Sequence, residues 1–407
     1  MIKRIDSQLL QPGMYVHDLD IPWVDHGFAQ QHFLVVDSAT ISRIISQGIH
    51  RLYIDTSKGR DLAPEAATKG EPQQEVHARI DATISELSQE TPPRRQRTVQ
   101  EEISTARKIC SDANAIVSQM MTMIRLGERI DAHQLEGIVN RIYRSVSRNP
   151  YALSGVSRIK IIDRYASMHC VSVASLAAAF ANYLGVDEGT VREITKGALL
   201  HDIGTAMIPD EILMKSTPPS DDEFRLLRGH VQLSISIIKK TMGVSAEMAT
   251  FVSRHHERCD GSGYPEGLTG DQIGKVGQMA AIIDVYDALT SPRGYRQAWP
   301  PTRALKKQLE WSPDHFNQEL MRLFIRMQGI FPIGTVVEMS SGLVGVVVDQ
   351  GKKLNAPVVK IFYNALESHF EPVRELDMSS SDEDQIRYAI SPERYRIDPK
   401  VVVSLYE

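Results

Sequence analysis

Histidines and carboxylates recur at short spacings in one region of this chain, and they limit how that region can fold. His255 and His256 are adjacent, and the loop sequence DGSGYP follows at residues 260–265. Upstream, His201 and Asp202 are neighbours within LLHDIG. Imidazole nitrogens and carboxylate oxygens together form a ligand set that suits Mn, Fe, Ni or Zn. Separate segments must meet for these groups to share a metal, so the pattern indicates a metal-dependent hydrolase.

Apolar residues at helical spacing surround these groups and predict a mainly α region. Two connecting helices are expected within residues 99–147, where a Met-rich apolar stripe favours packing against the next domain over the alternative, a dimer-forming surface. The later helices are expected at 163–184 with His169, at 188–200, after the capping box Ser220–Glu223 with His230, at 245–256 and at 275–290.

Two shorter regions with β character flank the helical part. Residues 1–57 combine alternating apolar runs, turn sequences and a predicted helix at 38–48, which indicates a small α+β module. Residues 58–98 are polar and are expected to form a solvated linker with room for a helical stretch in its middle. Residues 330–407 carry β-branched runs between turns, which predicts a short β appendage with a further strand at 398–405.

Composition argues against several classes of protein. A length of 407 residues favours two or three domains, and 42% apolar with 24% charged residues is typical of a soluble globular protein. The net charge of -5 argues against a DNA-binding function. Three cysteines without a CxxC pair, no apolar leader and no apolar run of membrane-spanning length predict a cytoplasmic protein without membrane insertion.

The order of the motifs resembles that of a known family. HD at 201–202, HH at 255–256, DGSGYP at 260–265 and DVYDALT at 284–290 are similar to the HD-GYP branch of the HD phosphohydrolase superfamily. The resemblance covers residues 151–329 and rests on several separated motifs, so it is far more specific than a lone His-Asp pair. Members of that branch hydrolyse the bacterial second messenger cyclic di-GMP.

The start of the chain resembles a small accessory domain that often precedes HD-GYP domains. The matching residues are LQPGMYV at 10–16 and the pair Pro22-Trp23. The expected organisation is therefore an accessory module at 1–57, an HD-type helical catalytic domain at 148–329, and the β appendage after it.

The resemblance also implies a ligand set for two divalent transition metals. The implied assignment is Asp202 as a bridge, His230, His255 and His256 at one metal, and His201 and Asp284 with His169 nearby at the other. In some relatives a glutamate one helical turn before the first histidine recruits a third metal. Tyr165 occupies that position here, so two metals are expected, which would activate a water for attack on phosphorus.

Residue chemistry bears on part of this assignment directly. His169 or His230 taken alone would more often be a core or surface histidine than a metal ligand. Asp284 lies among apolar residues of a predicted helix, where an unpaired carboxylate is costly and a cation is its natural partner. Asp287 lies three residues later on the same helix face, and we expect it to orient a ligand histidine or the attacking water.

Substrate contacts are expected beside the metals. The family's His-Asp-x-Gly-Lys sequence places a lysine near the scissile phosphate, whereas this chain has Thr205, which carries no charge. Arg293 and Arg296 lie where the family places phosphate-contacting basic residues, with a solvated surface pair as the alternative. Tyr264 either contacts the guanine dinucleotide or holds the loop shape, and Gly263 supplies backbone freedom beside it.

The sequence therefore predicts a cyclic di-GMP phosphodiesterase that opens the ring to pGpG, with cleavage to GMP left open. Its candidate catalytic residues are His201, Asp202, Thr205 and Asp287. The alternatives are a catalytically weak cyclic di-GMP sensor, which Thr205 favours, and an HD hydrolase for another nucleotide. Expected partners are cyclic di-GMP, proteins of cyclic di-GMP signalling and a second copy in a homodimer.

Overall fold

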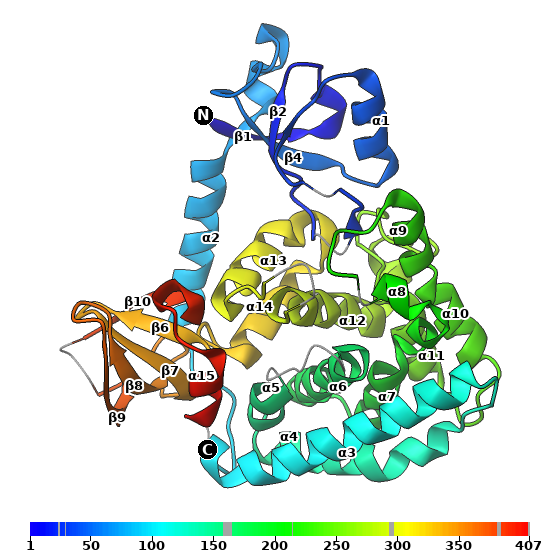
Figure 1. Ribbon diagram of the computed structural model, residues 1–407, viewed down its shortest axis with the longest axis vertical. Coiled ribbons are helices and arrows are strands. Elements are labelled where there is room, and N and C mark those ends of the chain that lie inside the picture. Colours follow the sequence, from blue (N-terminus) through cyan, green and yellow to red (C-terminus); the bar gives the residue numbers. More distant parts are fainter. Residues whose placement is uncertain are drawn as a thin grey trace.

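A helical body carries a small sheet-containing module at each of two sides (Figure 1). The computed structural model describes residues 1–22, 25–28, 30–157, 165–213, 215–292, 297–380 and 384–405. The N-terminal module has an apolar core of its own, whereas one face of the C-terminal sheet joins the core of the helical body. The predicted mainly α class, with an α+β module first and a β appendage last, is confirmed. Within the described residues, every helix is too short or too polar to span a lipid bilayer.

The N-terminal module is a five-stranded antiparallel sheet with one helix beside it. Its strands are β1 (Ile2–Asp6), β2 (Tyr15–Asp18), β3 (Phe33–Leu34), β4 (Arg51–Asp55) and β5 (Glu71–Pro72), in the order β3-β2-β4-β1-β5. The predicted helix is α1 (Ser38–Ser46), which begins where the Asp37 carboxylate accepts a hydrogen bond from the Thr40 amide. Ile44 of α1 is buried in the apolar core that this helix shares with the sheet.

The polar stretch at 58–98 contains regular structure. It supplies β5, which pairs with β1, and then α2 (Gln73–Ser88). Figure 1 shows α2 descending from the N-terminal module beside α13 toward the C-terminal sheet. Val76, Ile80 and Leu87 of α2 are buried, so this helix packs on the protein with one face although its overall composition is polar.

The Met-rich stripe of residues 99–147 belongs to the core, as predicted. Helix α3 (Val99–Arg125) begins with a capping box between Thr98 and Glu101. Its buried face, which includes Val117 and Met120, packs on α4 (Glu136–Arg148), α5 (Ala152–Ser157) and α6. The alternative, an exposed dimer-forming surface, is wrong for this face because the chain covers it itself.

The remaining helices of the body place the predicted site residues. They are α6 (Tyr165–Tyr183), α7 (Glu188–Leu200), α8 (Asp210–Leu213), α9 (Asp221–Arg228), α10 (His230–Ile238), α11 (Ala246–Arg254), α12 (Gly270–Thr290), α13 (Pro301–His315) and α14 (Gln318–Gln328). The predicted capping box between Ser220 and Glu223 opens α9, but the expectation that the same helix bears His230 is wrong, because α9 ends at Arg228 and His230 begins α10. Helix α12 begins earlier than expected and bends at Gly274, whose φ of 70° is accessible to glycine at little cost.

The C-terminal sheet is antiparallel, and one expected strand within this region is wrong. The strands are β6 (Val336–Met339), β7 (Leu343–Asp349), β8 (Val358–Asn364), β9 (His369–Asp377) and β10 (Ile386–Ile390), in the order β10-β6-β7-β8-β9. The strand expected at 398–405 is instead helix α15 (Pro399–Ser404). Val402 and Leu405, three residues apart, are both buried, so helical spacing overrides the β propensity of the valines.

Candidate metal centre

Three of the predicted ligand histidines are oriented by the same kind of side-chain hydrogen bond to the backbone. The ring Nδ1 of His201 lies 2.8 Å from the carbonyl oxygen of Ala198, three residues earlier. His230 and His255 repeat this arrangement with the carbonyl oxygens of residues 227 and 252, at 2.6 and 2.9 Å. A carbonyl oxygen only accepts, so each Nδ1 carries the proton and donates it. Each ring therefore keeps Nε2 clear of the backbone, as the nitrogen that can bind a metal.

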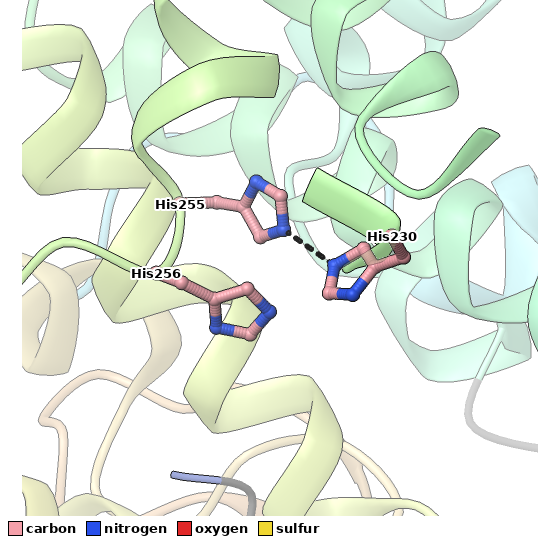
Figure 2. Close-up of side chains that lie close together, drawn as sticks. All are labelled: His230, His255 and His256. Atoms are coloured by element: carbon pink, nitrogen blue, oxygen red, sulfur yellow. Dashed lines mark hydrogen bonds between the residues drawn. The ribbon is translucent and has the colours of Figure 1, made fainter. Parts of the chain in front are cut away.

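These free nitrogens converge on one carboxylate oxygen. The Nε2 atoms of His230 and His255 are 3.3 Å apart (Figure 2). Asp202 Oδ1 lies 3.0 and 3.6 Å from them. Asp202 Oδ1 is buried and accepts no hydrogen bond from any described residue. Facing lone pairs and a carboxylate oxygen repel one another in a dry site unless a proton or a cation lies between them. The donor set therefore fits a divalent metal ion.

His256 completes this first cluster. Figure 2 shows its ring beside those of His230 and His255, with one ring nitrogen directed toward His230. Ligand atoms of the three histidines lie within 4.8 Å of one another, and all three residues are buried. Burial lowers the pKa of His256 well below its ordinary value, and it lowers the pKa of His255 as well. Both rings are therefore neutral at neutral pH and available to a cation.

A second cluster lies on the other side of Asp202. His169 Nε2 is 3.0 Å from Asp284 Oδ1 and 3.3 Å from His201 Nε2. Asp202 Oδ2 lies 3.7 Å from the Nε2 atom of each of these two histidines. The two oxygens of Asp202 thus face different clusters, which is the arrangement that a bridging carboxylate requires.

Asp287 reaches this second cluster through a histidine. Its Oδ2 lies 2.6 Å from His169 Nδ1, and Ser172 donates a hydrogen bond to its Oδ1. Asp284 and Asp287 are one turn apart on α12, so one carboxylate contacts each nitrogen of the same imidazole. A carboxylate on Nδ1 fixes the tautomer of His169 and makes its Nε2 a stronger ligand.

Electrostatics keeps both cluster carboxylates ionised. Burial opposes ionisation of Asp202, but the nearby His201 and His230 outweigh it and hold the pKa of Asp202 well below its ordinary value. Burial also opposes ionisation of Asp284, but the hydrogen bond with His169 and the nearby His201 hold its pKa well below the ordinary range. Both side chains are therefore anionic at neutral pH, as a cation site needs.

The GYP loop lies against the first cluster. The Tyr264 ring stacks on His256 with centroids 4.6 Å apart, and the Arg228 guanidinium lies 4.0 Å from the Tyr264 centroid. A Cβ on Gly263 would come within 2.3 Å of the Arg258 nitrogen and 2.5 Å of the Glu257 Cα, so the loop can pack here only with glycine. Gly263 thus brings Tyr264 to His256 by close backbone approach.

Two of the predicted substrate contacts fall outside the part of the chain that the structure describes. Arg293 and Arg296 lie outside the described residues, as does the side chain of Tyr165. Thr205 lies in the short turn η6 (Ile203–Met207), where its hydroxyl donates a 2.7 Å hydrogen bond to the carbonyl oxygen of Asp202. The Thr205 hydroxyl therefore donates its hydrogen bond to the backbone of Asp202, the predicted bridging ligand.

Sequence reasoning missed three residues that hold the GYP loop. Glu257 is fully buried, and its carboxylate accepts hydrogen bonds from the amides of Glu266 and Leu268, at 2.8 and 2.9 Å. Arg258 is 2% exposed and pairs with Asp25 of the N-terminal module. The placement of two charged residues between paired histidines and a glycine-rich loop was the available signal for Glu257 and Arg258. No local pattern marks Asp25, because its partner is more than two hundred residues away.

Two family models match the chain in succession. The first, described as a domain of unknown function (DUF3391), covers residues 2–135. The second, described as an HD domain, covers residues 142–320 and includes all the ligand candidates.

Curated relatives extend this likeness across most of the chain. The Pseudomonas aeruginosa protein named cyclic di-GMP phosphodiesterase PA4108 is 38% identical over 90% of this chain and 86% of its own length. The Xanthomonas campestris response regulator RpfG, also named a cyclic di-GMP phosphodiesterase, is 35% identical over 39% of this chain and 42% of its own. A Vibrio cholerae 3'3'-cGAMP-specific phosphodiesterase is 32% identical over 40% of this chain and 31% of its own. The chain therefore belongs to the HD-GYP family of HD-domain phosphohydrolases, with a DUF3391 domain before the catalytic domain.

Proposed function

We propose that this protein is a metal-dependent cyclic di-GMP phosphodiesterase. The observation that carries the proposal is the convergence of histidine Nε2 atoms on both oxygens of Asp202. The P. aeruginosa relative, which matches most of both chains, is named for this activity. The proposed product is the linear dinucleotide pGpG.

Two divalent transition metals, chosen from Mn, Fe, Ni and Zn, are the proposed cofactors. The proposed ligands are His230, His255, His256 and Asp202 Oδ1 for one ion, and His169, His201, Asp284 and Asp202 Oδ2 for the other. Such ions act as Lewis acids on the phosphodiester and supply an activated water at neutral pH.

The chain's own residues orient these groups. The Asp287 carboxylate holds His169 in the tautomer that directs Nε2 to the second cluster. The Tyr264 ring stacks on the ring of His256, and the Arg228 guanidinium lies over the Tyr264 ring. These contacts favour a loop-shaping role for Tyr264, since a guanine base that stacked there would have to displace one of them. Arg228, a half-buried basic residue beside this loop, is a candidate contact for a substrate phosphate.

A catalytically weak sensor of cyclic di-GMP is the second candidate. Thr205 favours it, because a neutral hydroxyl that already donates to the Asp202 carbonyl oxygen does not replace a lysine beside a phosphate. The two clusters favour the enzyme, because a protein that only binds a dinucleotide does not need a bridged pair of metal sites.

Hydrolysis of cyclic di-GMP by purified, Mn-loaded protein distinguishes these candidates. Chromatography of the products should give pGpG from the wild-type protein and none from Asp202→Asn. The same assay with 3'3'-cGAMP tests the substrate named for the V. cholerae relative. Binding of cyclic di-GMP without turnover at any metal loading would overturn the enzyme proposal in favour of the sensor. Faster cleavage of 3'3'-cGAMP than of cyclic di-GMP would correct the substrate.

A further inference from the structure

The N-terminal module is fixed to the catalytic helices by buried polar contacts. Asp20 is 2% exposed and pairs with Arg4 of its own module. It also accepts hydrogen bonds from Trp311 Nε1 and Lys307 Nζ of α13, at 3.1 and 3.2 Å. Buried charges of this kind are costly to separate, because each would be left without its partner. The module therefore sits on the catalytic domain in a defined position, above α13 and beside α9 (Figure 1).

One residue of this docked module reaches the loop that carries two ligand histidines. Both oxygens of Asp25 accept hydrogen bonds from Arg258, with Oδ1 at 2.9 Å and Oδ2 at 2.8 Å from Nη2 and Oδ2 at 3.1 Å from Nε. Arg258 Nη1 donates to the carbonyl oxygens of His255 and Glu257, at 3.3 and 2.8 Å. The guanidinium thus joins the module's carboxylate to the backbone that positions His255 and His256.

Asp25 also lies close to the metal-facing ring of His256. Its Oδ1 is 4.0 Å from His256 Nδ1, and Asp284 Oδ2 is 3.8 Å from the same nitrogen. His256 Nδ1 is buried and makes no hydrogen bond to any described residue. Asp25, Arg258, His256 and Tyr264 line one small cavity between the module and the catalytic domain. A change in charge at Asp25 therefore changes the electrostatic potential at the first cluster, because the two are close and little solvent separates them.

We propose that Asp25 is a positioning residue of the metal centre, whose carboxylate neutralises Arg258 and so sets the metal affinity of the cluster formed by His230, His255 and His256. Without that carboxylate, the buried guanidinium stays beside a site that has to accept a divalent cation. The two positive charges repel, and the metal binds more weakly. The inference rests on the proposed function, since it assumes that this cluster holds a metal.

This assignment gives the accessory module a part in catalysis. The DUF3391 region supplies the carboxylate that pairs with Arg258, so the metal centre of the HD domain keeps its full metal affinity only when the module is docked. Lifting the module would remove Asp25 and leave Arg258 unpaired.

Titration of the full-length, metal-free protein with Mn²⁺, followed by electron paramagnetic resonance of free Mn²⁺, tests the proposal without an activity measurement. In Asp25→Asn the dissociation constant of one Mn²⁺ should rise roughly 10- to 100-fold, the usual effect of losing a group that supports a ligand histidine. Asp25→Glu, which keeps the charge, should retain most of the affinity. Asp221→Asn is the matched control, because it breaks the exposed ion pair between Arg43 of the same module and α9. It should bind Mn²⁺ as the wild-type protein does.

The double variant Asp25→Asn with Arg258→Gln separates charge from packing. Removing the guanidinium should restore most of the affinity lost in Asp25→Asn, because no unpaired positive charge remains. Equal affinity in Asp25→Asn and wild type would overturn the proposal, and so would a double variant that binds more weakly than Asp25→Asn. If the wild-type protein itself binds no Mn²⁺, the proposed metal centre is wrong and the inference falls with it.

Discussion

Replacement of Glu257 by Gln should destabilise the GYP loop measurably. The buried carboxylate accepts two backbone hydrogen bonds, from the amides of Glu266 and Leu268. A glutamine has one acceptor oxygen, so it can keep one of these bonds without charge, while its NH₂ group faces the other amide. Hydrogen bonds to charged groups contribute about 1.5–3 kcal/mol each, so we expect a loss of about 2–3 kcal/mol in the free energy of unfolding.

Urea unfolding followed by far-ultraviolet circular dichroism measures this loss in the helical body. Glu266→Gln is the matched control, because Glu266 belongs to the same loop but its side chain is exposed. The control should change the free energy of unfolding by less than about 0.5 kcal/mol, as is usual for surface substitutions. A change that small in Glu257→Gln would refute the account of how this loop is held.

Three further variants test the site itself. Asp287→Asn should weaken binding of one metal roughly 10- to 100-fold in a Mn²⁺ titration, because His169 loses the carboxylate on its Nδ1; unchanged affinity would exclude that role. Thr205→Lys should raise the turnover number on the order of tenfold by restoring a charge-assisted phosphate contact; a fall with unchanged metal content would show that the site has adapted to threonine. Replacing both Arg293 and Arg296 by Ala should raise KM for cyclic di-GMP and flatten its salt dependence, with metal content unchanged; if KM stays constant at low and high salt, these arginines do not contact the substrate.

Much of the fold could be predicted from local patterns in the sequence. The helix at 188–200 and the capping box at Ser220 depend on neighbouring residues, and both are present as predicted. Strands β9 and β10 were not among the predicted runs, because charged residues interrupt the apolar pattern of β9 and β10 is only five residues long. The helix at 399–404 was mistaken for a strand, since its valines favour β structure and the burial of Val402 with Leu405 depends on distant parts of the chain.

The candidate site was predictable where its residues are contiguous motifs. His201-Asp202 and His255-His256 stand out by adjacency, and the structure brings both pairs together around Asp202. The tautomers of the histidines could not be inferred, because they depend on carbonyl oxygens positioned by helix geometry. Asp25 could not be found either, since contacts between residues far apart in sequence arise only when two domains dock.

The proposed two-metal centre depends most on Asp202, whose single carboxylate faces both clusters. Elemental analysis of the wild-type protein, purified in the presence of Mn or Fe, should give close to two metal equivalents per chain. Asp202→Ala should lose both metals together with cyclic di-GMP hydrolysis, because the two ions share this ligand. Retention of both metals in Asp202→Ala would contradict the bridging role. A reproducible wild-type content of three equivalents would contradict the two-metal centre.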